Sequence, residues 1–207
     1  MSATPAQDLE LFHAWRAGDS AAGNDLMERH YAAVLRFFAL KVPAVAEDLA
    51  QRTFLGCVEG IERLRSDASF KAFLFGVARR QLLWYLRDKT RDDGQRSRGG
   101  TIDEIGVPSG SGVLATREEH LLLLRALTVL PDDLQTVLQL HYWEDMASAD
   151  IGVAIGIPGS TVRGRLARAR ELLAEHVATL GRGSRAATAL SDDLEGWTRA
   201  LVGAPSP

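Results

Sequence analysis

Residues 150–170 read DIGVAIGIPGSTVRGRLARAR, and this stretch decides the fold of the C-terminal half of the chain. The turn Gly156-Ile-Pro-Gly159 separates a short helix predicted over 148–155 from a long helix predicted over 160–180. In the long helix the apolar residues recur at helical spacing: Val162, Leu166, Ala169, Leu173 and Val177. Such a stripe packs against a core, so the pattern indicates a helix-turn-helix.

Arginines lie outside this apolar stripe, at positions 163, 165, 168 and 170, and residues 160–170 contain no acid. Because an α-helix fits the major groove of B-DNA, arginines near its N-terminus can reach base edges and phosphates. Ser160 and Thr161 are predicted to cap the helix. Gly164 inside it costs about 1 kcal/mol relative to alanine, which a close approach to DNA would explain. The alternative is a helical hairpin with a solvated arginine face.

Upstream of this motif, helices are predicted over 118–130 and 132–143, with Pro131 between them and Asp132 or Asp133 as N-cap. Residues 92–116 are rich in Gly and Ser without a sustained apolar period, which is typical of a flexible linker. The predicted organisation is a first domain over 1–91, the linker over 92–116, a second domain over 117–180 and an extension over 181–207. In the extension a short helix over 191–201 is expected to dock on the body or on a regulator, and a flexible tail is the alternative.

The first domain shows a helical pattern throughout, with helices predicted over 7–17, 20–41, 46–64 and 70–88. In the third helix a core stripe is predicted at Ala50, Phe54, Cys57, Ile61 and Leu64. At about 100° per residue, the exposed face carries Asp48, Gln51, Arg52 and Leu55. An exposed leucine is an ordinary surface feature or a partner contact, and both interpretations stay open.

The fourth helix is apolar around most of its circumference and leaves a basic strip. Residues 70–91 contain six basic residues and one acid, Asp88, which gives this segment a charge of +5. The strip holds Arg79, Arg80 and Arg87 with Trp84 beside Arg80, and Lys89 and Arg91 continue it. Basic side chains attract phosphates, and an aromatic face accepts an unstacked base, worth about 1–3 kcal/mol per base. The alternative is a solvated helix face with Trp84 buried.

The composition of the 207 residues predicts a packed, soluble protein. Hydrophobic residues make up 46% and charged residues 25%, as in globular chains, and the aromatic share of 7% predicts mainly aliphatic cores. No stretch approaches the roughly 18 apolar residues of a membrane span and the start lacks a signal-peptide pattern, so a cytoplasmic protein without membrane insertion is expected. Cys57 is the single cysteine, and no zinc-ligand spacing or catalytic constellation is recognisable. We expect no metal, no cofactor and no enzymatic activity.

The net charge of −3 argues against a nucleic-acid partner only if charge is evenly spread. Binding depends on where charge lies, and two basic islands, over 70–91 and 160–170, stand out in an acidic chain. Each predicted domain therefore carries one cationic helix.

Segments in both domains resemble the bacterial sigma factors of the extracytoplasmic-function group, the smallest branch of the sigma-70 family. Residues 46–54, AEDLAQRTF, are similar to the family segment AEDLxQETF, and residues 70–87, FKAFLFGVARRQLLWYLR, are similar to FRxWLxxIARNxxxDxLR. Leu130-Pro131 begins a segment similar to LPxxxRxVLxLxY, and residues 150–170 align without gaps to EIAxxLGIPxGTVKSRLxRAR. The resemblance covers about residues 8–178.

The resemblance implies an all-α sigma factor. Its first domain would be sigma region 2, which binds core polymerase and the promoter −10 element, and its second domain the helix-turn-helix sigma region 4, which binds the −35 element. A base flipped during melting would enter a pocket formed by the loop over 64–69. The implied partners are core RNA polymerase, through its β′ and β subunits, promoter DNA, and an anti-sigma factor of the kind that many relatives have.

The site residues implied by the resemblance fall into three groups. The core-polymerase-binding residues are Asp48, Gln51, Arg52 and Leu55. The −10 DNA residues are Arg79, Arg80, Trp84, Arg87, Lys89 and Arg91. The −35 DNA residues are Ser160, Thr161, Arg163, Gly164, Arg165 and Arg168.

The chain departs from the family pattern at several of these places. Arg52 stands where the family has an acid, Arg80 where asparagine is common, and Trp84 where aspartate is common. Asp145 stands at a usual glycine. A stand-alone helix-turn-helix regulator is the rival interpretation, because it needs duplex binding only, and an interaction protein without promoter activity is another.

Overall fold

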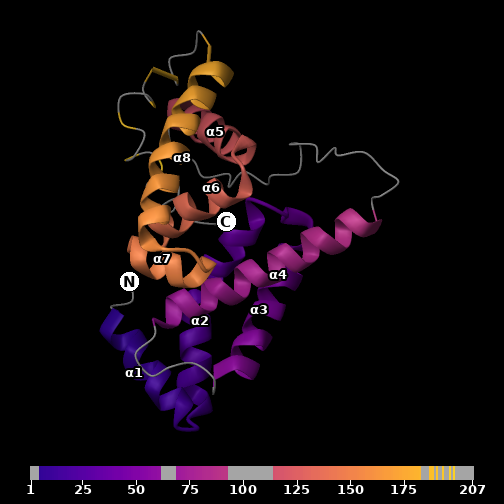
Figure 1. Ribbon diagram of the computed structural model, residues 1–207, viewed down its shortest axis with the longest axis vertical. Coiled ribbons are helices and arrows are strands. Elements are labelled where there is room, and N and C mark those ends of the chain that lie inside the picture. The colour runs from indigo at the N-terminus through magenta and orange to yellow at the C-terminus, as the bar shows by residue number, and fades with distance from the viewer. Residues whose placement is uncertain are drawn as a thin grey trace. The chain divides into compact units, whose positions relative to one another are not determined.

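The computed structural model describes residues 5–61, 69–92 and 114–182, together with residues 187, 188, 190, 193, 196 and 198. Every regular element in these ranges is helical (Figure 1), which confirms the all-α prediction. The chain forms two compact units, one made mainly of residues 1–100 and the other mainly of residues 101–207. None of the described helices combines the length and apolarity needed to cross a membrane.

The first unit contains α1 (Pro5–Arg16), α2 (Ser20–Ala39), the short 3-10 turn η1 (Pro43–Val45), α3 (Ala46–Gly60) and α4 (Phe70–Asp92). Along the chain, α1 packs on α2, α2 on α3, and α3 on α4. Asp19 begins α2 by accepting hydrogen bonds from the backbone N–H groups of Ala21 and Ala22 at 3.0 and 3.2 Å, as an N-cap residue does.

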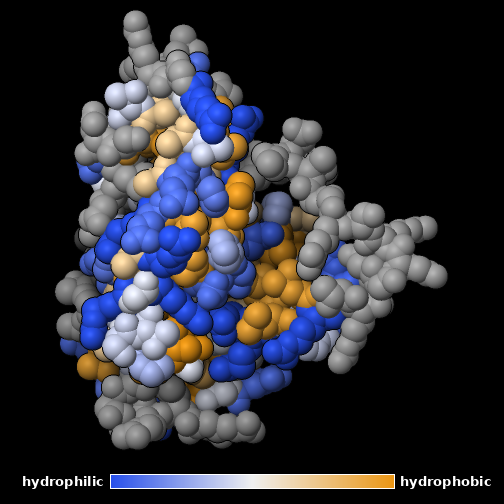
Figure 2. Space-filling view, turned by 45° about the horizontal axis from the view of Figure 1, so that its top comes forward, coloured by the Kyte–Doolittle hydropathy of each residue, from blue (hydrophilic) through white to orange (hydrophobic). Residues whose placement is uncertain are grey.

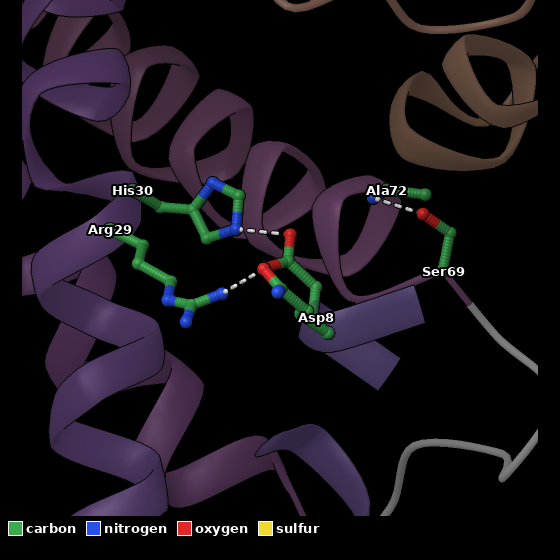
Figure 3. Close-up of polar contacts among 6 residues, drawn as sticks. Asp8, Arg29, His30, Ser69 and Ala72 are labelled. Atoms are coloured by element: carbon green, nitrogen blue, oxygen red, sulfur yellow. Dashed lines mark hydrogen bonds and ion pairs between the residues drawn. The ribbon is translucent and has the colours of Figure 1, made fainter. Parts of the chain in front are cut away.

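Two helix ends in the first unit differ by four residues from their predicted positions. α3 ends at Gly60, four residues before the predicted end at Leu64, while α4 continues to Asp92 beyond the predicted residue 88. Ser69 precedes α4, and its Oγ accepts the backbone N–H of Ala72 at 3.3 Å (Figure 3). The predicted base-pocket loop over 64–69 otherwise lies outside the described residues.

Aromatic residues are concentrated in the core of the first unit. All seven phenylalanines precede residue 92, and five of them are buried: Phe12, Phe37, Phe38, Phe70 and Phe75. The rings of Phe37 and Phe75 meet edge to face at 5.8 Å between centroids, which is a favourable geometry. The core stripe predicted for the third helix is confirmed at Ala50, Cys57 and Ile61, which are buried, and its last member, Leu64, lies outside the described residues. Phe54 instead stacks on Tyr31 at the surface side of the core.

A partly buried polar cluster joins α1 to α2. The imidazole Nε2–H of His30 donates to Oδ2 of Asp8 at 2.8 Å, and the Arg29 guanidinium lies 3.6 Å from the other carboxylate oxygen (Figure 3). The His30 ring also lies 5.6 Å from the ring of Phe70, at the start of α4. Burial lowers the pKa of His30 below its usual value, although the Asp8 carboxylate offsets part of this effect.

The second unit contains α5 (Leu114–Val129), α6 (Asp132–Leu138), the π-helical turn η4 (Gln139–Trp143), the first residues of α7 (Ser148–Ile155) and α8 (Gly159–Leu180). Residues 152–157, which include the end of α7, are grouped with the first unit. The long helix α8 packs against α5 and α6 (Figure 1). The apolar stripe predicted for this helix is confirmed, because its buried residues are Val162, Leu166, Ala169, Leu173 and Val177. This core is aliphatic, as expected.

The predicted caps of two helices in the second unit are wrong. Pro131 occupies the N-cap of α6 and Pro158 that of α8, and neither helix has a side-chain cap. Asp132 and Asp133 instead lie in the first turn of α6, where negative charge interacts favourably with the helix dipole. Ser160 and Thr161 are exposed in the first turn of α8, and their hydroxyls are not used to begin the helix.

Part of the C-terminal extension packs on the second unit. Leu190 and Thr198 are buried, and the indole N–H of Trp143 donates to the backbone carbonyl of Thr198 at 2.8 Å. Among the described residues of the extension, these contacts favour docking on the body over a flexible tail.

The buried histidine predicts a pH dependence of stability. Because the pKa of His30 is lower in the folded chain, the unfolded chain binds this proton more readily below pH about 6.5. The stability linked to neutral His30 is therefore present above that pH and is lost as pH falls through the folded-state pKa. Urea unfolding at pH 7.5 and 5.0 should show a larger loss on acidification for the wild type than for His30→Gln. His13→Gln, on the exposed side of α1, is the control, and equal losses in wild type and His30→Gln would contradict the prediction.

The docked extension predicts an effect of Trp143→Phe. This change removes the indole donor and leaves the Thr198 carbonyl without this partner, at a cost of about 0.5–1.5 kcal/mol. Amide hydrogen exchange over residues 187–198 should then accelerate by roughly 2- to 10-fold, while exchange in α2 stays unchanged. An unaltered exchange rate in the extension would show that this bond does not hold it.

Candidate nucleic-acid interface

α3 and α4 form a groove on the first unit. Its volume is about 630 Å³, and it is lined by Arg52, Leu55, Gly56, Glu59, Arg80, Gln81, Leu83, Trp84 and Arg87. The groove thus brings together residues that were predicted to bind two different partners. Arg52 and Leu55 were assigned to core polymerase, and Arg80, Trp84 and Arg87 to −10 DNA. Figure 2 shows hydrophilic side chains lying between separate hydrophobic areas on the face of the molecule that it draws.

Glycines let the two helices approach closely. A Cβ atom at Gly56 would lie 3.0 Å from the side chain of Val77, and one at Gly60 would lie 3.1 Å from the ring of Phe73. These glycines are four residues apart and therefore lie on the same face of α3. The contact fixes α3 against α4, so the walls of the groove hold a set spacing.

Cys57 lies beneath the groove and takes no part in its chemistry. The thiol is fully buried, and burial raises its pKa to about 12, although the charge of Arg80 opposes this shift. Because the thiolate is the nucleophilic form, Cys57 acts as a packing residue.

The predicted polymerase face of α3 is exposed along its length. Asp48, Gln51, Arg52 and Leu55 are all exposed, and the Leu55 side chain is 63% exposed. Val58, which the sequence analysis missed, is 49% exposed and lies one turn after Leu55. Val58 follows Leu55 by three residues, and this helical spacing could have placed it on the same face of α3. Arg52 donates from Nε to Asp48 at 2.9 Å across one turn.

The basic strip of α4 lies along the other wall. Arg80, Trp84 and Arg87 line the groove, and Trp84 is 54% exposed, so the alternative in which this ring is buried is wrong. Lys89 is exposed further along α4. Arg79 is half-buried and does not line the groove. The side chain of Arg91 lies outside the described residues.

The arginines of α8 divide into outward and inward groups. Arg163 and Arg168 are exposed, and Arg168 pairs with Glu171 at 3.1 Å. Arg165 is half-buried and lies 3.5 Å from the Asp133 carboxylate of α6. Arg170 donates from Nε to the Tyr142 hydroxyl at 2.6 Å and stacks over that ring. Arg170 thus stabilises the unit, while Arg163 and Arg168 are exposed.

Two turns set the direction of the helix-turn-helix. Gly156 has φ of +74°, which glycine adopts without cost, and the N–H groups of Gly156 and Ile157 both donate to the Gly152 carbonyl at 2.9 and 3.0 Å. Asp145 has φ of +51° before α7. Glycine, which is usual here in the family pattern, adopts this left-handed conformation without strain. Aspartate tolerates it better than most other residues.

Gly164 has open space around it. No atom beyond its own helix and its chain neighbours lies within 4 Å of the position its Cβ would take, and the residue is exposed. Packing within the described chain therefore does not require glycine here. A partner that closely approaches the backbone of α8 would require glycine at this position.

Comparisons with known proteins match both units. The family model Sigma-70 region 2 matches residues 26–92, and Sigma-70, region 4 matches residues 120–173. A probable RNA polymerase sigma factor, RfaY of Xanthomonas campestris pv. campestris, is 29% identical over 174 residues, which are 78% of this chain and 42% of that protein's length. The extracytoplasmic-function sigma-E factor of Salmonella typhimurium is 25% identical over 184 residues, covering 84% of this chain and 95% of the relative.

A solved structure shares the fold. The sigma factor RpoE from Bartonella quintana, crystallised with the anti-sigma factor NepR, gives a TM-score of 0.59 at 24% identity and covers 71% of this chain and 91% of that one.

The open space at Gly164 yields a prediction with two opposite effects. Gly164→Ala should stabilise the second unit by about 0.5–1 kcal/mol through helix propensity, and it should weaken duplex binding if the backbone closely approaches DNA. Chemical unfolding measures the first effect and DNA affinity the second. Ala174→Gly, an exposed position later in α8, should lower stability without changing DNA affinity. An unchanged DNA affinity of Gly164→Ala would contradict a close approach of DNA to the backbone at Gly164.

Proposed function

This chain belongs to the extracytoplasmic-function group of the sigma-70 family, and on that premise we propose how its two units divide the recognition of a promoter. It is an RNA polymerase sigma factor, which acts with core polymerase and promoter DNA. We propose that it is a cytoplasmic initiation factor without catalytic activity of its own.

The first unit binds core polymerase through the exposed face of α3 in this proposal. An apolar residue flanked by charged and polar ones, as Leu55 is by Asp48 and Gln51, is the composition of a protein contact. The exposed Val58 extends this patch. The β′ subunit is the partner assigned to this face, and the β subunit completes the contact with the enzyme.

The same unit binds the −10 element through α4. Arg80 and Arg87 supply positive charge for the phosphates, and the exposed ring of Trp84 supplies a stacking face for a base of the melted strand. Melting costs a few kcal/mol per unstacked base, and these contacts with the single strand recover it.

The second unit reads the −35 element with the N-terminal half of α8. The observation that carries this assignment is the separation of the apolar stripe of α8 from Ser160, Thr161, Arg163 and Arg168, which are all exposed. Since the helix buries its stripe in its own unit, the outward face is available to the major groove.

An anti-sigma factor is a further proposed partner. The shared fold with a sigma factor that was crystallised with its anti-sigma factor supports this.

Transcription in vitro tests the proposed function against a stand-alone regulator. Purified chain is added to sigma-free core polymerase on a pool of genomic templates, and transcripts are mapped. We expect specific start sites that need both components, and band shifts with promoter DNA only when core enzyme is present. Duplex binding by the chain alone, without start sites, would identify a helix-turn-helix regulator instead.

The exposed face of α3 predicts an effect of Leu55→Ala. Truncating a central apolar contact should weaken binding to core polymerase by about 1–2 kcal/mol, while stability changes by less than about 0.5 kcal/mol because the side chain is exposed. Leu9→Ala, at the 45% exposed Leu9 of α1, is the matched control. Titration of labelled chain with core enzyme measures both, and equal affinities would place the polymerase contact elsewhere.

A further inference from the structure

Arg52 contacts both the predicted polymerase face of α3 and the α4 strip. Its guanidinium carbon lies 5.7 Å from the centre of the Trp84 ring, over that ring. Its Nε also pairs with the Asp48 carboxylate at 2.9 Å. Gln51 and Arg52 are about 100° apart on the helix, so a partner centred on Gln51 meets Arg52 only at its edge.

Cationic and aromatic side chains from both helices meet in the groove. Arg52 lies on the α3 wall, and Arg80 and Trp84 lie on the α4 wall. Three of the four places where the chain departs from the family pattern that its segments resemble are therefore in this groove. Positive charge and an exposed aromatic ring favour the same class of ligand.

Resting on the proposed role of α4 at the −10 element, we propose that Arg52 is a promoter-DNA residue that acts together with Trp84 on the melted strand. Arg52 covers part of the indole and fixes its orientation, and its guanidinium neutralises a phosphate of the same strand. A base of that strand stacks on the exposed part of the ring.

The lining of the groove favours a nucleic-acid strand over an acidic protein segment. Arginine beside an aromatic face is the combination that single-strand sites use, because phosphates pair with guanidiniums at the solvent edge while a base stacks. A packed protein segment would desolvate the guanidiniums of Arg52, Arg80 and Arg87, and each would then need a buried carboxylate.

The test uses holoenzyme and two templates from a promoter mapped by in vitro transcription. One template is fully duplex, and the other is a fork whose −10 region is a single non-template strand. Arg52→Ala should weaken binding to the fork by roughly 5- to 20-fold and lower the salt slope, log K against log[salt], by about 0.7, the value for one single-strand phosphate. Affinity for core polymerase should change less than about 2-fold.

The matched control is Arg16→Ala. Arg16 is exposed on the same unit and makes a contact of the same kind, with its guanidinium carbon 5.8 Å from the Phe12 ring centre. It lies outside the groove lining, so its loss should leave the fork affinity and the salt slope unchanged.

A double-mutant cycle tests whether Arg52 and Trp84 act as one contact. Trp84→Ala should weaken fork binding strongly, Trp84→Phe should retain part of it, and Arg52→Ala should add little in the Trp84→Ala background. Weaker core binding by Arg52→Ala with an unchanged fork affinity would identify a protein contact and overturn the proposal. Full additivity, or no effect on either template, would also overturn it. These outcomes differ from failure of the proposed function, in which the wild-type holoenzyme itself yields no start sites.

Discussion

The close contact between α3 and α4 is the constraint on which the first unit depends. Gly56 and Gly60 leave room for Val77 and Phe73, and the buried side chains around them hold the two helices at that spacing. Even a Cβ atom at either glycine would require Val77 or Phe73 to shift by a few tenths of an ångström. The close packing that brings Arg52 over Trp84 therefore depends in part on two residues that present no side chain to a partner.

The second unit reaches a similar result by a different route. Its long helix is anchored by a stripe of aliphatic residues and by Arg170, which binds Tyr142. Arg165 is held beside Asp133. This division leaves the N-terminal turns of α8 outward, with Arg163 at their centre. Arginines of one sequence motif thus take different roles, because helical periodicity places some of them toward neighbouring helices.

Much of the fold was predictable from local pattern. The helical stripes of α3 and α8 follow from a period that sequence displays directly, and the family segments gave the identity of both units. The contact of Arg52 with Trp84 was not predictable. The two residues are 32 positions apart in sequence, and their contact depends on how closely α3 and α4 pack. The caps of α6 and α8 were mispredicted because a proline preceding a helix satisfies its geometry without a side-chain acceptor. The docking of the extension was one of the two alternatives open from the sequence, but its bond from Trp143 to Thr198 joins residues 55 apart and has no local signature.

The burial of Cys57 has a consequence for how the cell can address this protein. A thiol whose pKa is about 12 is almost entirely protonated at physiological pH. It therefore reacts slowly with peroxide or with a disulfide. The given sequence contains no second cysteine, so Cys57 has no partner within it for an intramolecular disulfide. Its thiol is therefore a poor target for a signal that acts by oxidising cysteine.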